Sequence, residues 1–207
     1  MVIFLGLLVM LVVAMWSYKY AWWKSAVDWK RPRVLMYHMV REHIKGAKFN
    51  KLRVTPAEFE KQVAWMKADG FHFVTMQELQ ANWGKHPEKT VAITFDDGYL
   101  DNLEHAFPIL EKYQAKATIY VVVDRHDRDW STYKKAHHNS GELAREPKLS
   151  DVQVQQLAHS GLVEIASHTL THANLDKLDD TQCFMELSES KQKLEELTAQ
   201  PVTSFAY

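Results

Sequence analysis

From about residue 33 to the end of the chain, short apolar runs alternate with segments whose apolar residues recur at helical spacing. The runs predict strands that are buried on both faces, and the segments between them predict helices with one apolar side. This order is typical of an α/β fold in which helices cover a mostly parallel sheet, either open or closed into a barrel. The predicted strands are residues 33–40, 71–74, 91–95, 117–123, 162–167 and 203–207.

Residues that typically begin helices place the predicted helices between these strands. Thr55 and Thr75 are predicted N-caps, and each is followed three residues later by a glutamate, as in a capping box. Ser150 is a third predicted N-cap, and Pro108 is expected to bend a helix or shift its start. The predicted helices cover about residues 55–70, 75–84, 102–114, 150–159 and 180–199.

Length and composition exclude several classes of protein. A chain of 207 residues suits one domain, or one domain with an appendage. Apolar residues make up 46% of it, which argues against disorder. The formal net charge of −1 gives no reason to expect a nucleic-acid partner. The single cysteine, Cys183, excludes an internal disulfide and a cysteine-based zinc cluster.

The amino-terminal segment has the composition of a membrane helix. Val2–Tyr18 carries no charge, begins as an almost wholly aliphatic run, and ends among tryptophans and tyrosines of the kind that gather at membrane interfaces. Its length is near the lower limit of roughly 17–25 residues for a spanning helix. A cleaved secretion signal is the alternative, although no basic residue precedes the run and no clean small-x-small site follows it. The predicted units are a membrane anchor at 1–23, a linker at 24–31 and a domain at 32–207.

Two polar motifs follow two of the predicted strands. Thr94-Phe95-Asp96-Asp97-Gly98 comes at the end of one run, and Ser167-His168-Thr169-Leu170-Thr171-His172 comes at the end of another. Alone, an Asp-Asp-Gly sequence is usually a turn, and a His-x-x-x-His spacing is usually accidental. Because the carboxyl ends of parallel strands meet at one edge of a sheet, we expect the two motifs to form one site.

An aspartate and two histidines can bind a divalent cation and leave coordination positions open. His168 and His172 are spaced i, i+4, so a helical turn there would point both imidazoles to one side. Ser167 or Thr171 could orient one of the rings. The second aspartate could then take a proton from water, although the residues alone do not say which aspartate has which role. The motifs therefore predict metal-assisted hydrolysis of an amide or ester.

Other polar residues have less specific interpretations. Tyr37 and His38, at the end of the first predicted strand, face the same rim, either as a packed pair or as a wall of the substrate cleft. The charged stretch 124–148 shows no assignable period, and its His137 and His138 are expected to be solvated.

The two motifs also resemble those of a known family. Thr94–Tyr99 and Ser167–His172 are similar to the first two motifs of the polysaccharide deacetylases (carbohydrate esterase family 4, the NodB homology domain). Val34–His38 and Ser204–Tyr207 resemble the branch that deacetylates poly-β-1,6-N-acetylglucosamine in biofilm matrices. The similarity runs from about Pro32 to the end of the chain.

This resemblance implies a distorted, incomplete (β/α) barrel and a role for each motif residue. Asp96 is the implied general base. The implied ligands of a divalent metal, commonly zinc, are Asp97, His168 and His172. The candidate substrate-binding residues are Tyr37, His38, Tyr99 and Tyr207.

Two departures from the family pattern stand out. Ala206 occupies the position of an arginine that pairs with the base in many members. The chain also stops before the family's later motifs, which include the histidine that acts as general acid, and the sequence suggests no replacement for it. We therefore expect this chain alone to be inactive or weakly active.

The expected function is removal of N-acetyl groups from an extracellular N-acetylglucosamine polymer, in particular poly-β-1,6-N-acetylglucosamine. A peptidoglycan or chitin-type deacetylase, a non-catalytic carbohydrate-binding member of the fold and a membrane-tethered scaffold are the alternatives. The expected partners are the polysaccharide, a membrane and the machinery of polysaccharide synthesis and export.

The expected location is extracytoplasmic, in the periplasm or at the cell surface. The positive-inside tendency points the other way, because it would keep the basic flank of the anchor in the cytoplasm. That flank contains Lys19, Lys24, Lys30, Arg31 and Arg33.

Overall fold

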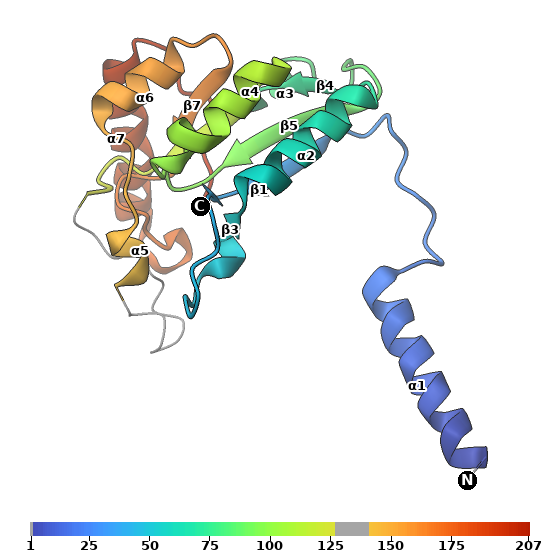
Figure 1. Cartoon of the computed structure of the whole chain (residues 1–207). Coiled ribbons are helices and arrows are strands. Elements are labelled where there is room, and N and C mark those ends of the chain that lie inside the picture. The colour runs from blue at the N-terminus through green and yellow to red at the C-terminus, as the bar shows by residue number, and fades with distance from the viewer. Residues whose placement is uncertain (1, 127–140) are drawn as a thin grey trace.

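A parallel sheet forms the centre of the molecule (Figure 1), whose computed structural model describes residues 2–126 and 141–207. Its strands follow the order β1–β5–β6–β7, and β4 pairs with the first half of β5. A separate parallel pair joins β2 to β3. The strands are β1 (Arg33–Tyr37), β2 (Met39–Val40), β3 (Arg53–Val54), β4 (His72–Val74), β5 (Thr90–Phe95), β6 (Ala117–Val121) and β7 (Val163–Ser167).

The helices begin where the sequence predicts them. Thr55, Thr75 and Ser150 each accept the backbone N–H three residues later, and the last two form complete capping boxes. Pro108 lies in the first turn of α4, directly after the π-helical segment η2 (Asn102–Ala106). The α-helices are α1 (Val2–Tyr20), α2 (Pro56–Ala68), α3 (Met76–Ala81), α4 (Phe107–Tyr113), α5 (Glu142–Arg145), α6 (Asp151–Ala158) and α7 (Asp180–Thr198). The 3-10 turns within the described residues are η1 (Asn50–Leu52) and η4 (Leu175–Lys177).

One face of the sheet is apolar and is covered by helices. Ile93, Phe95, Ile119 and Ile165 are buried in a single cluster with side chains of α2, α4 and α6. Figure 1 shows α2 and α4 side by side over the sheet, while α6 and α7 lie beside β7. Because a fully buried large apolar side chain contributes about 1.5–3 kcal/mol, this layer is the main source of stability for the strands that carry the site.

The alternating side chains on the opposite face are more polar. The Glu164 carboxylate accepts hydrogen bonds from the Thr118 hydroxyl at 2.8 Å and from the Gln77 N–H, in the first turn of α3, at 2.9 Å. A carboxylate at a helix amino terminus satisfies an unpaired donor and interacts favourably with the helix dipole. Asp96 and His168 continue this polar face beyond the ends of β5 and β7.

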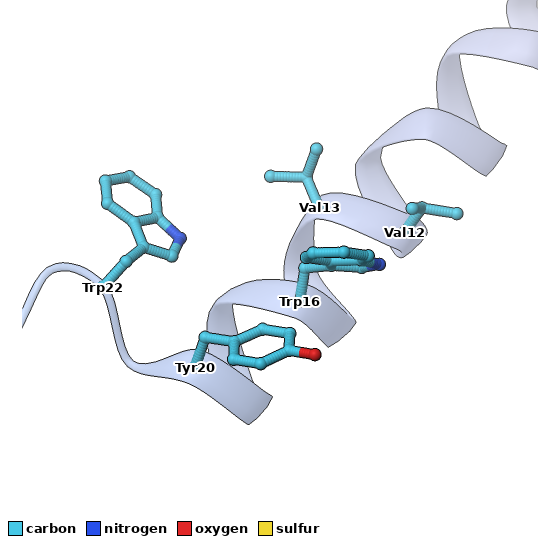
Figure 2. A pocket seen from close by; sticks show the side chains of 5 residues that line it. All are labelled: Val12, Val13, Trp16, Tyr20 and Trp22. Atoms are coloured by element: carbon cyan, nitrogen blue, oxygen red, sulfur yellow. The ribbon is translucent and has the colours of Figure 1, made fainter. Parts of the chain in front are cut away.

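Helix α1 stands apart from the domain at the end of an extended linker (Figure 1). An apolar cleft of about 540 Å³ lies along this helix, and its lining side chains are drawn in Figure 2. The cleft is lined by Val12, Val13, Trp16, Tyr20 and Trp22. Over the described residues, no helix combines the length and apolar character needed to cross a bilayer.

Two expectations about strands need correction. The predicted strand 33–40 is interrupted at His38 and continues as the short β2. The predicted strand 203–207 is reduced to one bridge between Ser167 and Phe205. The strand path runs from β1 to β7 without returning to β1 within the described part of the chain. Residues 127–140, which include His137 and His138, lie outside the described residues.

Candidate active site

The turn after β5 carries the two adjacent aspartates. Asp97 adopts a left-handed backbone conformation with φ of 74°, and Gly98 follows with φ of 71°. In a continuing strand the two carboxylates would point to opposite faces of the sheet. The left-handed turn redirects the chain at Asp97, so both acids reach the mouth formed by the strand ends. For a non-glycine residue this conformation costs roughly 1–2 kcal/mol.

Asp97 lies against both histidines of the second motif. Its Oδ1 atom is 3.2 Å from Nε2 of His168 and 3.4 Å from Nε2 of His172. The two imidazole centroids are 4.9 Å apart, and one ligand atom from each of the three residues lies within 4.8 Å of the others. The predicted grouping of these residues from two distant motifs is confirmed.

These three residues fit a divalent metal ion. Asp97 Oδ1 is buried and makes no well-directed hydrogen bond to a described residue, although two ring nitrogens lie close to it. A buried, unsatisfied carboxylate oxygen is costly, and a cation shared with the two imidazoles would satisfy it. One carboxylate and two imidazoles are also a common ligand set for catalytic zinc and similar ions.

The electrostatics of the cluster support this arrangement. Burial by itself would raise the pKa of Asp97, but the adjacent His168 and His172 outweigh it and hold that pKa well below its usual range. Burial would lower the pKa of His168, but the close Asp97 carboxylate more than compensates and raises it. Asp97 is therefore a carboxylate at neutral pH, as a metal ligand must be.

The loop from His168 to His172 is not the helical turn that the i, i+4 spacing suggested. Thr169 and His172 have left-handed backbone conformations, with φ of 66° and 59°. The chain bends at Leu170 and Thr171, between these two residues, and forms no helical turn there. The imidazoles therefore meet across a bent loop and not on a shared helix face.

The ring of His168 is oriented by the backbone of the terminal segment. Its Nδ1 atom is 2.9 Å from the carbonyl oxygen of Ala206, which leaves Nε2 to face Asp97. The prediction that Ser167 or Thr171 orients a ring is wrong for His168. The Ser167 hydroxyl is 2.7 Å from that of Ser190, and the Thr171 hydroxyl donates to Glu186. Ala206, which the resemblance places at the position of an arginine, thus contributes its main chain to the site.

Asp96 lies beside the cluster with a different environment. Burial is the main cause that raises its pKa, and the nearby His168 and His38 act against it. The Nε2 atom of His38 is 4.0 Å from Oδ2 of Asp96. The site therefore places a buried carboxylate and an imidazole side by side at the edge of the sheet.

The position of His38 follows from strand register. Tyr37 pairs with Phe95 between β1 and β5, so the next residues, His38 and Asp96, leave the sheet side by side. The Asn102 side-chain amide donates to the His38 carbonyl at 2.8 Å and fixes the backbone there. Sequence reasoning placed His38 on the rim but missed its approach to Asp96, because the pairing of β1 with β5 is not visible in the sequence.

The described contacts of the three candidate tyrosines are with residues outside this group. The Tyr37 hydroxyl donates to Gln62 at 2.6 Å, and its ring packs against Phe59 and Phe95 on the helix-covered face. Tyr99 is fully buried under the ammonium group of Lys148. Tyr207 is exposed and stacks on Phe205. Of the four predicted substrate-binding residues, His38 is the one that the structure brings beside Asp96.

Comparison with known proteins relates this chain to polysaccharide deacetylases. A sequence model described as polysaccharide deacetylase matches residues 84–207, more than half of the chain. Over 190 residues the chain is 34% identical to Bacillus subtilis YxkH, a protein assigned to the polysaccharide deacetylases, and the match covers 90% of this chain and 59% of YxkH. It is 30% identical over 147 residues to the poly-β-1,6-N-acetyl-D-glucosamine N-deacetylase of Staphylococcus epidermidis, covering 65% of this chain and 47% of that enzyme.

A solved structure agrees with these matches. The crystal structure of a polysaccharide deacetylase from Bacillus cereus superposes with a TM-score of 0.69 at 32% identity, covering 85% of this chain and 50% of that one. This chain thus spans about half to three-fifths of the length of these relatives. The parallel sheet, the two motifs at its edge and these similarities show that the chain belongs to the polysaccharide deacetylase family.

Proposed function

We propose that this chain carries the metal-binding and proton-transfer groups of an enzyme that removes N-acetyl groups from an N-acetylglucosamine polymer. One observation carries the proposal: Asp96 stands beside the Asp97–His168–His172 cluster at the carboxyl edge of a parallel sheet. A base beside a cation site is the arrangement that hydrolysis of an unactivated amide requires. Family membership supports the same reaction class.

In the proposed reaction, Asp97, His168 and His172 hold a divalent cation, for which we propose zinc. When bound there, the cation would polarise the acetyl carbonyl and lower the pKa of water. Asp96 takes the proton from the attacking water, and its raised pKa makes it a better base than an ordinary aspartate. His38 gives a proton to the leaving nitrogen as the C–N bond breaks. The products are acetate and a free amine on the sugar.

For the polymer, we propose poly-β-1,6-N-acetylglucosamine. The printed activity of the Staphylococcus epidermidis relative supports this choice. A β-1,4-linked substrate, such as peptidoglycan or chitin, is the competing possibility. Because the polymers concerned are extracellular, we also propose that the domain works outside the cytoplasm, beside the polysaccharide synthesis and export machinery. Alkaline phosphatase fused after residue 30 should be active in cells, since it folds only after export, and an inactive fusion contradicts that location.

Acetate release from defined oligomers tests the reaction and the linkage together. His38 beside Asp96 supplies a proton donor that the sequence alone did not suggest. With zinc added, the protein should therefore release acetate from β-1,6-linked tetramers faster than from β-1,4-linked ones. Asp96→Asn should lower the rate roughly 10²–10⁴-fold, the usual contribution of a general base, and His38→Gln should lower it within the same range. Gln77→Ala, remote from the site, is the control.

The outcomes separate the alternatives. Faster release from β-1,4 oligomers would reject the proposed linkage. Oligosaccharide binding without acetate release, under any divalent metal, would identify a non-catalytic carbohydrate-binding protein. A rate unaffected by Asp96→Asn would contradict the assigned base.

A further inference from the structure

The loop that carries the two histidines is held from outside the site by one carboxylate. Glu186, on the second turn of α7, accepts three hydrogen bonds from this loop. Its Oε2 atom accepts the N–H groups of Leu170 and Thr171, both at 2.9 Å. Its Oε1 atom accepts the Thr171 hydroxyl at 2.6 Å. All three donors lie between the two histidines.

The loop needs such support because its backbone is strained. Thr169 is β-branched and buried, yet it has φ of 66°, a conformation that is rare for this class of residue. His172 is also left-handed, with φ of 59°. Strained conformations of this kind persist only where the surrounding structure over-determines them. Leu170 and Thr171, whose N–H groups Glu186 binds, are the residues between the two strained positions.

The other side of the loop is fixed by β6 and the residues that follow it. The His168 N–H donates to the Val121 carbonyl at 2.9 Å, and the Asp124 N–H donates to the Leu170 carbonyl at 2.8 Å. These bonds hold the start and middle of the loop against the sheet. Glu186 binds the N–H groups of Leu170 and Thr171 from the α7 side, so Leu170 is bound through both its carbonyl and its N–H.

Helix α7 contacts the loop at a second point one turn further along. The Ser190 hydroxyl is 2.7 Å from that of Ser167, which in turn accepts the Thr169 N–H at 3.1 Å. Glu186 and Ser190 are spaced i, i+4, so they lie on the same face of the helix. One helix face therefore supports the loop before His168 and again before His172.

We propose that Glu186 is a positioning residue that keeps His168 and His172 in their metal-binding arrangement. This inference rests on the proposed function, because it concerns the same metal site. Glu186 does not contact the ion or the substrate; it acts through the backbone of the loop. Residues that orient metal ligands typically change metal affinity about 10–100-fold when they are removed.

Metal affinity without substrate is the direct test. Zinc binding is measured by competition with a chromophoric chelator, and the visible absorption of the cobalt-substituted protein reports ligand geometry. Glu186→Ala should weaken zinc binding about 10–100-fold and change the cobalt spectrum. Glu186→Gln should stay within about threefold of the wild type, because its amide can accept both N–H groups while its NH₂ donates to the Thr171 hydroxyl. Glu189→Ala, on the same helix but paired only loosely with Lys193 at 3.9 Å, is the matched control.

The results distinguish this inference from the proposed function. A wild-type protein that binds no divalent metal overturns both. A wild type that binds zinc together with a Glu186→Ala variant that binds it as tightly as Glu189→Ala overturns the positioning role alone. If Glu186→Ala does not fold, Thr171→Val removes one of the three bonds and should weaken binding severalfold, and unchanged affinity in that variant overturns the role.

Discussion

Three residues of the candidate site adopt left-handed backbone conformations although none of them is glycine. They are Asp97, Thr169 and His172. Two of them carry ligand atoms, and the third directly follows His168. Conformations of this kind cost free energy and cluster at functional sites, where neighbouring contacts maintain them. The geometry of the site is therefore set by backbone strain as much as by side-chain identity.

Asp101 illustrates another constrained residue close to the site. Its carboxylate accepts the Val40 N–H at 2.9 Å and an amide hydrogen of Asn102 at 3.2 Å. Burial raises its pKa from 3.8 to about 6, despite the opposing effects of the Val40 hydrogen bond and of Arg41. The folded protein thus binds a proton here more tightly than the unfolded chain does. Its contribution to stability is present at low pH and is lost as pH rises from about 4 through 6.

Asp101→Asn should remove this pH dependence. At about 1.4 kcal/mol for each pKa unit, the rise from 3.8 to about 6 corresponds to about 3 kcal/mol. Relative to the wild type, the variant should therefore gain up to about this much unfolding free energy between pH 4 and pH 7. Urea denaturation at several pH values, with chelator present, measures the difference. If the difference in unfolding free energy between the variant and the wild type stays constant from pH 4 to pH 7, Asp101 does not have a raised pKa in the folded protein.

The helices and strands that could be predicted are those marked by a pattern within their own stretch of sequence. Apolar runs identified the strands, and side-chain caps such as Thr75 and Ser150 identified helix starts. The two motifs could be joined because parallel strands share a carboxyl edge. The loop after β7 could not be predicted, since its left-handed residues have no glycine to signal them. Glu186 and His38 were also missed in their roles, because only tertiary packing brings them to the motifs.

The Ser150 cap of α6 allows a direct test at this scale. Its hydroxyl accepts the Gln153 N–H, and the Gln153 side chain accepts the Ser150 N–H in return. Ser150→Ala should lower the unfolding free energy by about 1 kcal/mol, because a helix donor loses its partner. Val152→Ala, at an exposed position of the same helix, should change it by less than about 0.5 kcal/mol. Equal losses of unfolding free energy for the two substitutions in urea denaturation would show that the Ser150 cap does not stabilise α6.

Across the whole molecule, a buried ion-pair network joins segments that are distant in the sequence. The Arg53 side chain, at β3, is completely buried. Its guanidinium lies 3.0 Å from Glu142 and 2.6 Å from Glu146, and Arg41 pairs with Glu146 from the other side. Glu142 also accepts the N–H groups of Lys48 and Phe49. The network therefore ties α5 to the connection between β2 and β3.

Removing the Arg53 guanidinium from this network should lower the stability of the whole domain. Arg53→Met removes the guanidinium that Glu142 and Glu146 share, although Arg41 still pairs with Glu146. We expect a loss of about 3 kcal/mol of unfolding free energy, at the lower end of the range for a broken buried pair. Lys112→Ala, which breaks the exposed pair with Glu60, serves as the control and should leave the melting temperature unchanged. Similar thermal shifts for the two variants would show that the network contributes no more than a surface ion pair.

The central claim is that Asp97, His168 and His172 bind one divalent ion beside a base that does not bind it. Metal content after dialysis against zinc, measured by mass spectrometry, tests this claim most directly. The wild type should retain one zinc per chain, Asp97→Ala, His168→Ala and His172→Ala should each retain almost none, and Asp96→Asn should retain one. Stoichiometric zinc in all three ligand variants, or no zinc in the wild type, would contradict the account.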